Sequence, residues 1–267
     1  MTDHKTGRRR ALITGAAQRL GRAMVLDLAR TGWDVAVHYR TSSTGAEETA
    51  AEARALGAQA ALVQGDLFSE RETATLVRQA SRALGGPLSL LINNASYFEL
   101  DEIATMTRDT WDRAIESNLR APVKLTQDFA AQAPKAQPDG KGEPVAQAVV
   151  INLIDQRILK PTPLFLSYIV AKSGLMAFTR SAAQALGPDV RVAGIGPGPT
   201  LVAEGQSDTH FAMQRAACIL QRGADLDDIV SAMRFILENK AFTGQMLAID
   251  GGQHLIWQGP DTGGDGH

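Results

Sequence analysis

Arg10-Ala11-Leu12-Ile13-Thr14-Gly15-Ala16-Ala17-Gln18-Arg19-Leu20-Gly21 is the stretch that decides the fold of this chain. It reads as a short apolar strand, a glycine turn and the start of a helix that continues to Ala29. A dinucleotide pyrophosphate binds the helix N-terminus at such a turn, because glycine lets the backbone come close. A glycine turn alone is weak evidence. This one lies between a strand and a helix, which is the context that the motif requires.

Length and composition favour one domain of α/β class. The chain has 267 residues, of which 44% are hydrophobic, enough for one large core. We expect a single Rossmann-type domain, a doubly wound parallel sheet of about seven strands with helices on both faces, and flexible tails at 1–9 and 258–267. The formal charge of −2 gives no basic field for nucleic acid.

The sequence also points to a cytoplasmic protein. It has one cysteine, Cys218, so no intrachain disulfide can form, which fits a reducing compartment. It has no apolar run of membrane-spanning length and no apolar leader, so we expect neither a membrane helix nor a signal peptide. We predict no metal site.

The remaining apolar runs and polar breaks divide the chain into further elements. We expect strands at 35–39, 60–67, 88–96, 148–154, 190–195 and 246–252, helices at 46–56, 70–84, from 111, through 168–186 and at 225–238, and an exposed loop at 133–147.

The end of the second expected strand indicates the type of dinucleotide. Val35-Ala36-Val37-His38-Tyr39 runs into Arg40-Thr41-Ser42, where NAD-preferring folds carry an acidic residue. A guanidinium with hydroxyl groups suits a 2′-phosphate, because arginine can bind it bidentately. We therefore predict NADPH rather than NADH. The alternative is that Arg40 is only a surface loop residue.

A second motif lies in Ser167-Tyr168-Ile169-Val170-Ala171-Lys172-Ser173-Gly174. Four residues separate Tyr168 from Lys172, so a helix places both side chains on one face. The positive charge of Lys172 is expected to lower the pKa of Tyr168 towards working pH, which would suit the tyrosine to proton transfer. The alternative is an ordinary helix with a surface lysine and a half-buried tyrosine.

These two motifs together resemble the short-chain dehydrogenase/reductase family, from Ala11 to about Trp257. The chain departs from the family pattern at Arg19, where a glycine is usual, and at Asp155, where most members carry a catalytic serine. At both positions the chain resembles the pteridine reductase branch, which includes bacterial dihydromonapterin reductases. The resemblance implies a homotetramer and a substrate lid at 200–223.

The resemblance also implies the cofactor-binding residues. Asp66 would bind the adenine amino group and the Leu67 amide a ring nitrogen, although Asp66 can instead be a helix N-cap, for which Ser69 is better placed. Asn94 would line the ribose, and the backbone at Pro197 and Gly198 would meet the nicotinamide carboxamide. The full predicted set is Gly15, Arg19, Leu20, Gly21, His38, Arg40, Thr41, Ser42, Asp66, Leu67, Asn94, Ala95, Ser96, Tyr168, Lys172, Pro197 and Gly198.

The predicted substrate residues are Arg19, Ser96, Phe98, Asp155 and Tyr168. By resemblance, Phe98 would stack on a pterin ring, as an exposed aromatic ring does well; alternatively it packs within its loop. The predicted catalytic residues are Asp155, Tyr168, Lys172 and Asn118. By resemblance Asn118 helps hold a water that links the lysine to solvent, although a buried asparagine can also be purely structural.

Asp155 distinguishes between the candidate reactions. A carboxylate beside a developing alkoxide is repulsive, whereas it can accept hydrogen bonds from the amino and ring N–H groups of a pterin. We therefore predict hydride transfer from NADPH to a pteridine C=N bond, in a substrate of dihydrobiopterin, dihydromonapterin or dihydrofolate type. The alternatives are a carbonyl reductase of the same family and a non-catalytic NADP(H)-binding protein.

Overall fold

Seven parallel strands form the central sheet of the computed structural model, which describes residues 8–203 and 205–257. The strand order is β3-β2-β1-β4-β7-β8-β9, and every neighbouring pair is parallel. The strands are β1 (Arg9–Ile13), β2 (Trp33–Tyr39), β3 (Ala60–Gln64), β4 (Leu90–Asn93), β7 (Ala148–Leu153), β8 (Val190–Pro197) and β9 (Met246–Ile249). The predicted Rossmann-type sheet is confirmed.

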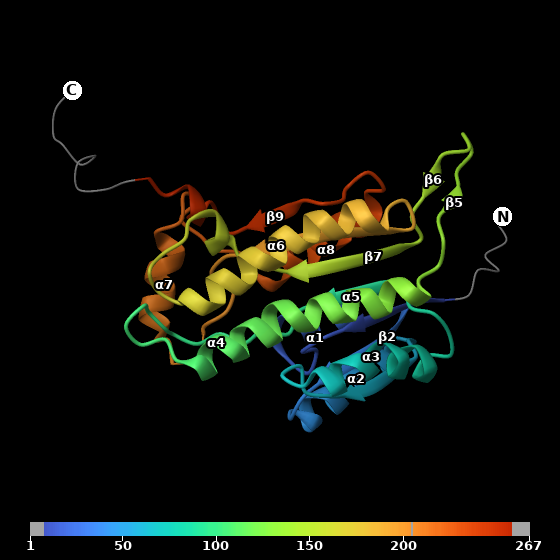
Figure 1. The fold of residues 1–267 in the computed structure, drawn as a ribbon, viewed down its shortest axis with the longest axis horizontal. Coiled ribbons are helices and arrows are strands. Elements are labelled where there is room, and N and C mark those ends of the chain that lie inside the picture. The colour runs from blue at the N-terminus through green and yellow to red at the C-terminus, as the bar shows by residue number, and fades with distance from the viewer. Residues whose placement is uncertain (1–7, 204, 258–267) are drawn as a thin grey trace.

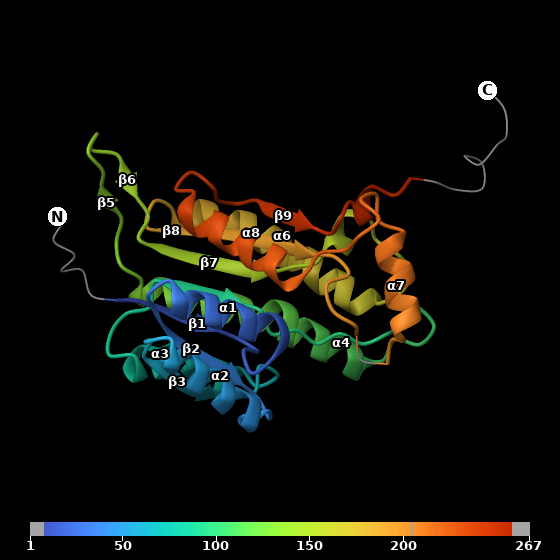
Figure 2. The same ribbon diagram turned by 180° about the vertical axis from the view of Figure 1, so that it is seen from behind.

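Two layers of helices cover the sheet (Figures 1 and 2). One core cluster joins the sheet to α1 (Arg19–Arg30), α2 (Ser43–Ala55) and α8 (Leu226–Glu238). The other joins the opposite face to α3 (Glu70–Ala83), α5 (Ala121–Gln132) and α6 (Leu166–Leu186). The central strands are apolar and buried on both faces, as in β7, where all six residues are buried. Continuous apolar strands of this kind are typical of parallel sheets.

The helix expected to start at Trp111 begins earlier and contains an interruption. It starts as α4 (Arg108–Ile115), capped by Thr107, whose side chain accepts a hydrogen bond from the amide of Thr110. One π-helical segment, η1 (Glu116–Arg120), then connects it to α5. π-Helical segments occur mostly within α-helices and often at functional sites. Here the segment contains Asn118.

Two sequence expectations need correction, and the predicted lid segment contains a helix that was not predicted. The segment 133–147 is not wholly a loop, because β5 (Gln137–Pro138) and β6 (Pro144–Val145) pair as a short antiparallel hairpin. The 200–223 segment contains the helix α7 (Asp208–Ala216). The expected N-terminal tail is too long by at least two residues: β1 begins at Arg9, and Arg8 Nη1 donates to the carbonyl of Gly57 at 2.7 Å. The rest of the expected tails, 1–7 and 258–267, lies outside the described residues.

The topology determines where a ligand binds. The chain builds the sheet outward from β1 to β3, then crosses to β4 on the other side of β1 and continues to β9. In doubly wound sheets, ligands bind at the carboxyl ends of the strands where the strand order reverses. The loops after β1, β4 and β7 meet there. Within the described ranges, no helix is both long and apolar enough to cross a bilayer.

Candidate active site

The glycine turn after β1 forms a closely packed cradle. Gly15 has a φ of +60°, and a Cβ added to it would lie 2.9 Å from the Cα of Ala95. A Cβ on Gly21 would lie 2.4 Å from the carbonyl oxygen of Gly15. The Asn94 side chain donates to the carbonyls of Thr14 and Gly15 at 2.8 and 3.0 Å. The turn is therefore fixed to the end of β4, and it needs glycine at both positions.

His38 binds the glycine turn through a side-chain hydrogen bond. It is buried in β2, and its Nδ1 accepts a hydrogen bond from the Gly15 amide at 3.1 Å. Its Nε2 lies 3.1 Å from the carbonyl oxygen of Gly65, which can only accept, so Nε2 carries the proton. Burial lowers the pKa of His38 to about 4, against weaker opposing contributions from Gly65 and Asp66. The side chain is neutral at pH 7.

A cleft of about 460 Å³ opens above the cradle. It contains most of the predicted cofactor residues: Gly15, Arg19, Leu20, Gly21, His38, Arg40, Thr41, Ser42, Asp66, Leu67, Asn94, Ala95 and Ser96. Tyr168, Lys172, Pro197 and Gly198 are not among its lining residues. The fold therefore brings thirteen of the predicted residues, from separate segments of the chain, to one edge of the sheet.

Several lining residues were not predicted from the sequence. The most prominent are Phe68 and Arg113: the guanidinium carbon of Arg113 lies 4.7 Å from the Phe68 ring centroid, and that of Arg40 lies 5.1 Å from it. Neither residue belongs to a motif, so no sequence pattern points to them. Asp66 does not cap α3. Its carboxylate accepts from the Phe68 amide at 3.0 Å, while the Ser69 side chain caps the helix.

The second cluster lies where β7 ends beside α6. Asp155 follows β7 and Tyr168 lies in the first turn of α6; both are buried. The Tyr168 hydroxyl donates to Asp155 Oδ2 at 2.8 Å. Asp155 Oδ1 accepts from the Arg157 amide at 2.7 Å, and Arg157 Nη1 lies 3.4 Å from Oδ2. The sheet edge and the helix thus bring a phenol and a carboxylate into direct contact.

The predicted effect of Lys172 on Tyr168 is wrong for this structure. Burial raises the pKa of Tyr168 well above its ordinary value, the charge and hydrogen bond of Asp155 raise it further, and only the charge of Arg157 and the nearby Ser96 side chain oppose them. Lys172 Nζ lies 5.6 Å from the Tyr168 ring centroid and donates to the Leu153 carbonyl at 2.7 Å. Burial lowers the pKa of Lys172 to about 8. Tyr168 is therefore held in the protonated form.

Phe98 lies against this cluster. Its ring stacks on Phe165 with centroids 4.3 Å apart, and it meets Tyr168 edge to face at 4.8 Å. The side chain nevertheless stays 39% exposed. Phe98 is thus packed within its loop and also presents part of its surface beside Tyr168. Its stacking on a substrate stays a prediction.

Asn118 holds the loop that carries Ser96. Its Oδ1 accepts from the Ser96 hydroxyl at 2.9 Å and from the Tyr97 amide at 3.0 Å, and its Nδ2 donates to the Tyr97 carbonyl at 2.8 Å. The side chain is fully buried. These contacts support the structural alternative for the Asn118 side chain, and its part in a water relay stays a prediction.

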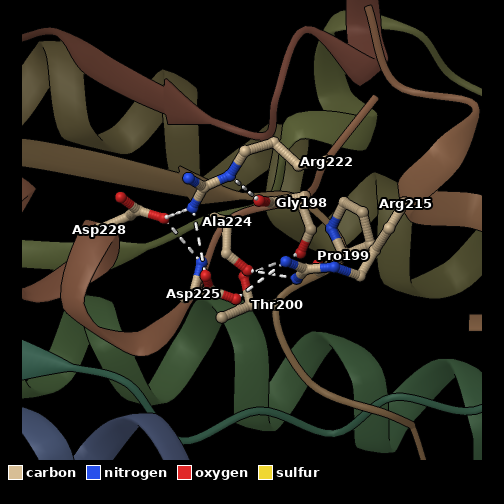
Figure 3. A network of polar contacts seen from close by, with 9 residues as sticks. Gly198, Pro199, Thr200, Arg215, Arg222, Ala224, Asp225 and Asp228 are labelled. Atoms are coloured by element: carbon tan, nitrogen blue, oxygen red, sulfur yellow. Dashed lines mark hydrogen bonds and ion pairs between the residues drawn. The ribbon is translucent and has the colours of Figure 1, made fainter. Parts of the chain in front are cut away.

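The predicted lid segment, 200–223, is hydrogen-bonded to the residues that directly precede and follow it (Figure 3). From α7, Arg215 Nη1 donates to the carbonyls of Pro199 and Ala224 at 3.0 and 2.7 Å, and Nη2 binds Asp225 at 2.8 Å. Arg19, in the cradle, donates to the Val202 carbonyl at 2.9 Å. Gly198 passes so close to Asp250 that an added Cβ would lie 2.5 Å from the aspartate Cβ. The lid therefore contacts the cleft through Arg19.

The fold and these two clusters define an oxidoreductase of the nucleotide-binding α/β type, and comparison with known proteins gives its family. Residues 9–211 match the family model for short chain dehydrogenases, so the chain belongs to the short-chain dehydrogenase family. The curated relatives include the short-chain dehydrogenase/reductase eriH of Hericium erinaceus, 32% identical over 91% of this chain and 96% of that protein. They also include the 3-oxoacyl-[acyl-carrier-protein] reductase FabG of Staphylococcus aureus, 26% identical over 92% of this chain and 98% of that one.

Two solved structures resemble this protein more strongly. FolM alternative dihydrofolate reductase 1 of Brucella suis, in complex with NADP, is 41% identical and has a TM-score of 0.87, covering 95% of this chain and 98% of that one. The Brucella canis counterpart, also complexed with NADP, is 39% identical with a TM-score of 0.86, covering 96% and 98%. The family predicted from the glycine turn and the Tyr168–Lys172 pair is confirmed.

Proposed function

We propose that this protein is an NADPH-dependent reductase of a pteridine ring, acting on a substrate of dihydrobiopterin, dihydromonapterin or dihydrofolate type. The observation that carries the proposal is the hydrogen bond between Tyr168 and Asp155 at the sheet edge, beside the partly exposed ring of Phe98. A carboxylate, a phenol and an aromatic surface together suit a flat heterocycle that carries N–H groups.

The cleft fits NADPH. The cradle has glycine at positions 15 and 21 and precedes the N-terminus of α1, and a glycine turn of this kind lets a pyrophosphate come close to the backbone. Arg40 lines the same cleft together with Thr41 and Ser42, and a guanidinium with hydroxyl groups suits the 2′-phosphate. NADPH supplies the hydride when it is bound.

Asp155 and Tyr168 orient the substrate and supply the proton. An ionised carboxylate offers about four acceptor positions. Those of Asp155 already accept from Tyr168 and from the amide and guanidinium of Arg157, so about one remains for a substrate N–H group. Tyr168 is protonated at neutral pH and lies in contact with Phe98, so it is the group that can donate a proton to a ring nitrogen.

The solved relatives support the same substrate class. Both Brucella proteins are described as alternative dihydrofolate reductases, and dihydrofolate contains a pteridine ring. The FabG relatives act by name on a 3-oxoacyl carbonyl, but they share less of the sequence, with 26% identity. A carbonyl reductase is therefore the second candidate.

The direct test measures NADPH oxidation with dihydrobiopterin, dihydromonapterin, dihydrofolate and a simple ketone. Turnover of at least one pteridine, well above that of the ketone, is the expected result. If NADPH binds tightly and none of the three pteridines is reduced, the proposal is wrong.

Tyr168→Phe provides a second test, because phenylalanine keeps the ring contact with Phe98 but cannot donate a proton. The variant is expected to lose turnover by about 10²-fold or more, in the range usual for a general acid, while its NADPH affinity changes little. Retained activity would remove Tyr168 from the mechanism.

We also propose that the protein assembles as a homotetramer, as the family resemblance implies. Two features are consistent with assembly. β9 is the last strand in the sheet order, and Phe235 on the adjacent helix α8 is 45% exposed. Size-exclusion chromatography with light scattering tests this proposal, and a monomeric mass would contradict it.

A further inference from the structure

Arg157 lies at the meeting point of the acidic and aromatic parts of the site. It belongs to the short 3₁₀ helix η2 (Gln156–Leu159), two residues after Asp155. Its amide and guanidinium both contact the Asp155 carboxylate, at 2.7 and 3.4 Å. Its guanidinium carbon lies 5.3 Å from the ring centroid of Phe98 and 5.4 Å from that of Phe165. The residue belongs to neither of the two sequence motifs.

We propose that Arg157 is a positioning residue that holds the Asp155 carboxylate towards Tyr168 and orders the Phe98–Phe165 pair beside them. The proposal rests on the reductase function proposed above. It assigns two separable contributions to one side chain, a charge that acts on Asp155 and a flat surface that acts on the two rings.

The charge contribution follows from the groups that face Asp155. A buried carboxylate needs a hydrogen-bonding or charged partner. From α6, Tyr168 offers a neutral hydroxyl, and the ammonium of Lys172 is bound to the Leu153 carbonyl and has a pKa lowered to about 8 by burial. From η2, Arg157 offers a guanidinium that stays charged at every working pH. It is therefore the partner of Asp155 whose charge is constant.

The packing contribution follows from the two rings. Phe98 and Phe165 are 67 positions apart in the sequence and stack with an interplanar angle of 11°. A guanidinium within about 6 Å of a ring centroid is attracted to the ring face. Lysine keeps the charge but lacks the planar fork, so it reproduces this contact poorly. Arg157→Lys therefore separates the two contributions.

The experiment is a double-mutant cycle on the full-length protein. The variants are Arg157→Gln, Arg157→Lys, Asp155→Asn and the Asp155→Asn/Arg157→Gln double variant. Arg78→Gln serves as the matched control, because Arg78 is exposed on α3 and distant from the site in sequence and fold. For each protein, kcat and KM are measured with NADPH and the pteridine that the wild-type protein turns over, and circular dichroism checks the fold.

Arg157→Gln is expected to lower kcat about tenfold or more, since it leaves a buried carboxylate with fewer partners. In the Asp155→Asn background the same change should alter kcat less than about threefold, because residues in one network are not additive. Arg157→Lys should retain kcat within about threefold of wild type and raise the KM for the pteridine. Arg78→Gln should behave as wild type. Additive losses in the double variant, an unchanged Arg157→Gln enzyme, or a lysine variant no better in kcat than glutamine would each overturn the proposal.

The same proteins distinguish failure of this proposal from failure of the reductase function. If the wild-type protein reduces no pteridine, the reductase function is wrong, and urea unfolding of the four proteins of the cycle still measures the coupling between Asp155 and Arg157. If the wild-type protein is active and the cycle is additive in kcat, Arg157 is not a positioning residue and the reductase function stands.

Discussion

Acidification is expected to destabilise this protein through His38. The imidazole is buried and neutral, with Nδ1 accepting from Gly15 and Nε2 donating to Gly65. Burial lowers its pKa to about 4, whereas an unfolded chain gives histidine a pKa of about 6.5. Between these two values the unfolded state binds more protons than the folded state, so stability rises with pH and is lost as the pH falls from about 6.5 to 4.

The magnitude follows from the two pKa values. One pKa unit corresponds to about 1.4 kcal/mol, so the full difference amounts to about 3 kcal/mol. Most of it is lost between pH 7 and pH 5, where linkage gives a decrease of about 2 kcal/mol. Protonation of His38 in the folded protein also removes the acceptor for the Gly15 amide, so NADPH affinity is expected to fall as the pH approaches the folded pKa of about 4.

The assay compares urea unfolding of wild type, His38→Gln and His38→Asn at several pH values between 4 and 7, followed by far-UV circular dichroism. The two variants keep different hydrogen bonds, since the glutamine amide can reach towards Gly65 and the asparagine amide towards Gly15. Neither variant titrates in this range, and all other acidic groups are common to the three proteins. Both variants should therefore be less stable than wild type at pH 7 and lose less stability on acidification. Equal pH slopes in all three proteins would refute the reasoning.

Three further predictions concern the cradle, the buried lysine and the lid. Gly21→Ala should lower the free energy of unfolding by about 1–3 kcal/mol and weaken NADPH binding, because the added Cβ has no space. Thermal unfolding and NADPH titration measure the two effects. The control is Gly140→Ala, where an added Cβ meets nothing within 4 Å, and this variant should behave as wild type. Lys172→Met should stabilise the cofactor-free protein at pH 7 by about 1–2 kcal/mol. The folded pKa of about 8 lies below the unfolded one, so keeping the lysine charged costs the folded state about 3 kcal/mol; the variant regains this, less the cost of leaving the Leu153 carbonyl without its donor. A lower unfolding midpoint for this variant than for wild type would contradict that sign. Arg215→Ala should speed amide hydrogen exchange in α7 with little effect on the central sheet. Unchanged exchange in α7 would show that the hydrogen bonds from Arg215 to Pro199 and Ala224 (Figure 3) do not hold this segment in place.

Local patterns were sufficient to predict the sheet and the cradle. The strands are short apolar runs between polar breaks, and the turn at Gly15 is flanked by a strand and a helix in the chain itself. The cap at Ser69 follows from its place before the helix and was predicted. Parallel strands end at one edge of the sheet, so the order of motifs along the chain is enough to assign the residues that follow β1, β2 and β4 to one cleft.

Through-space contacts could not be predicted in this way. The pKa of Tyr168 depends on its burial and on Asp155, thirteen residues away, and these outweigh a lysine on the same helix face. Arg113 lies in α4 and Phe68 in the turn before α3, so they meet from distant parts of the chain, and no motif contains them. Arg157 was missed because its role depends on side chains gathered from three segments of the chain.

The physical reason for preferring a C=N bond to a ketone is the charge left after hydride addition. Reduction of a ketone leaves an alkoxide until a proton arrives, and a carboxylate about 4 Å away raises the energy of that anion by about 4 kcal/mol at an effective dielectric constant of about 20. This penalty corresponds to about a thousandfold in rate. A protonated C=N bond becomes a neutral amine on reduction, so the carboxylate opposes no developing anion and stabilises the cationic form that precedes it. An acid at position 155, in contact with a phenol that is protonated before the reaction, therefore supports the proposed reduction at a nitrogen-bearing carbon.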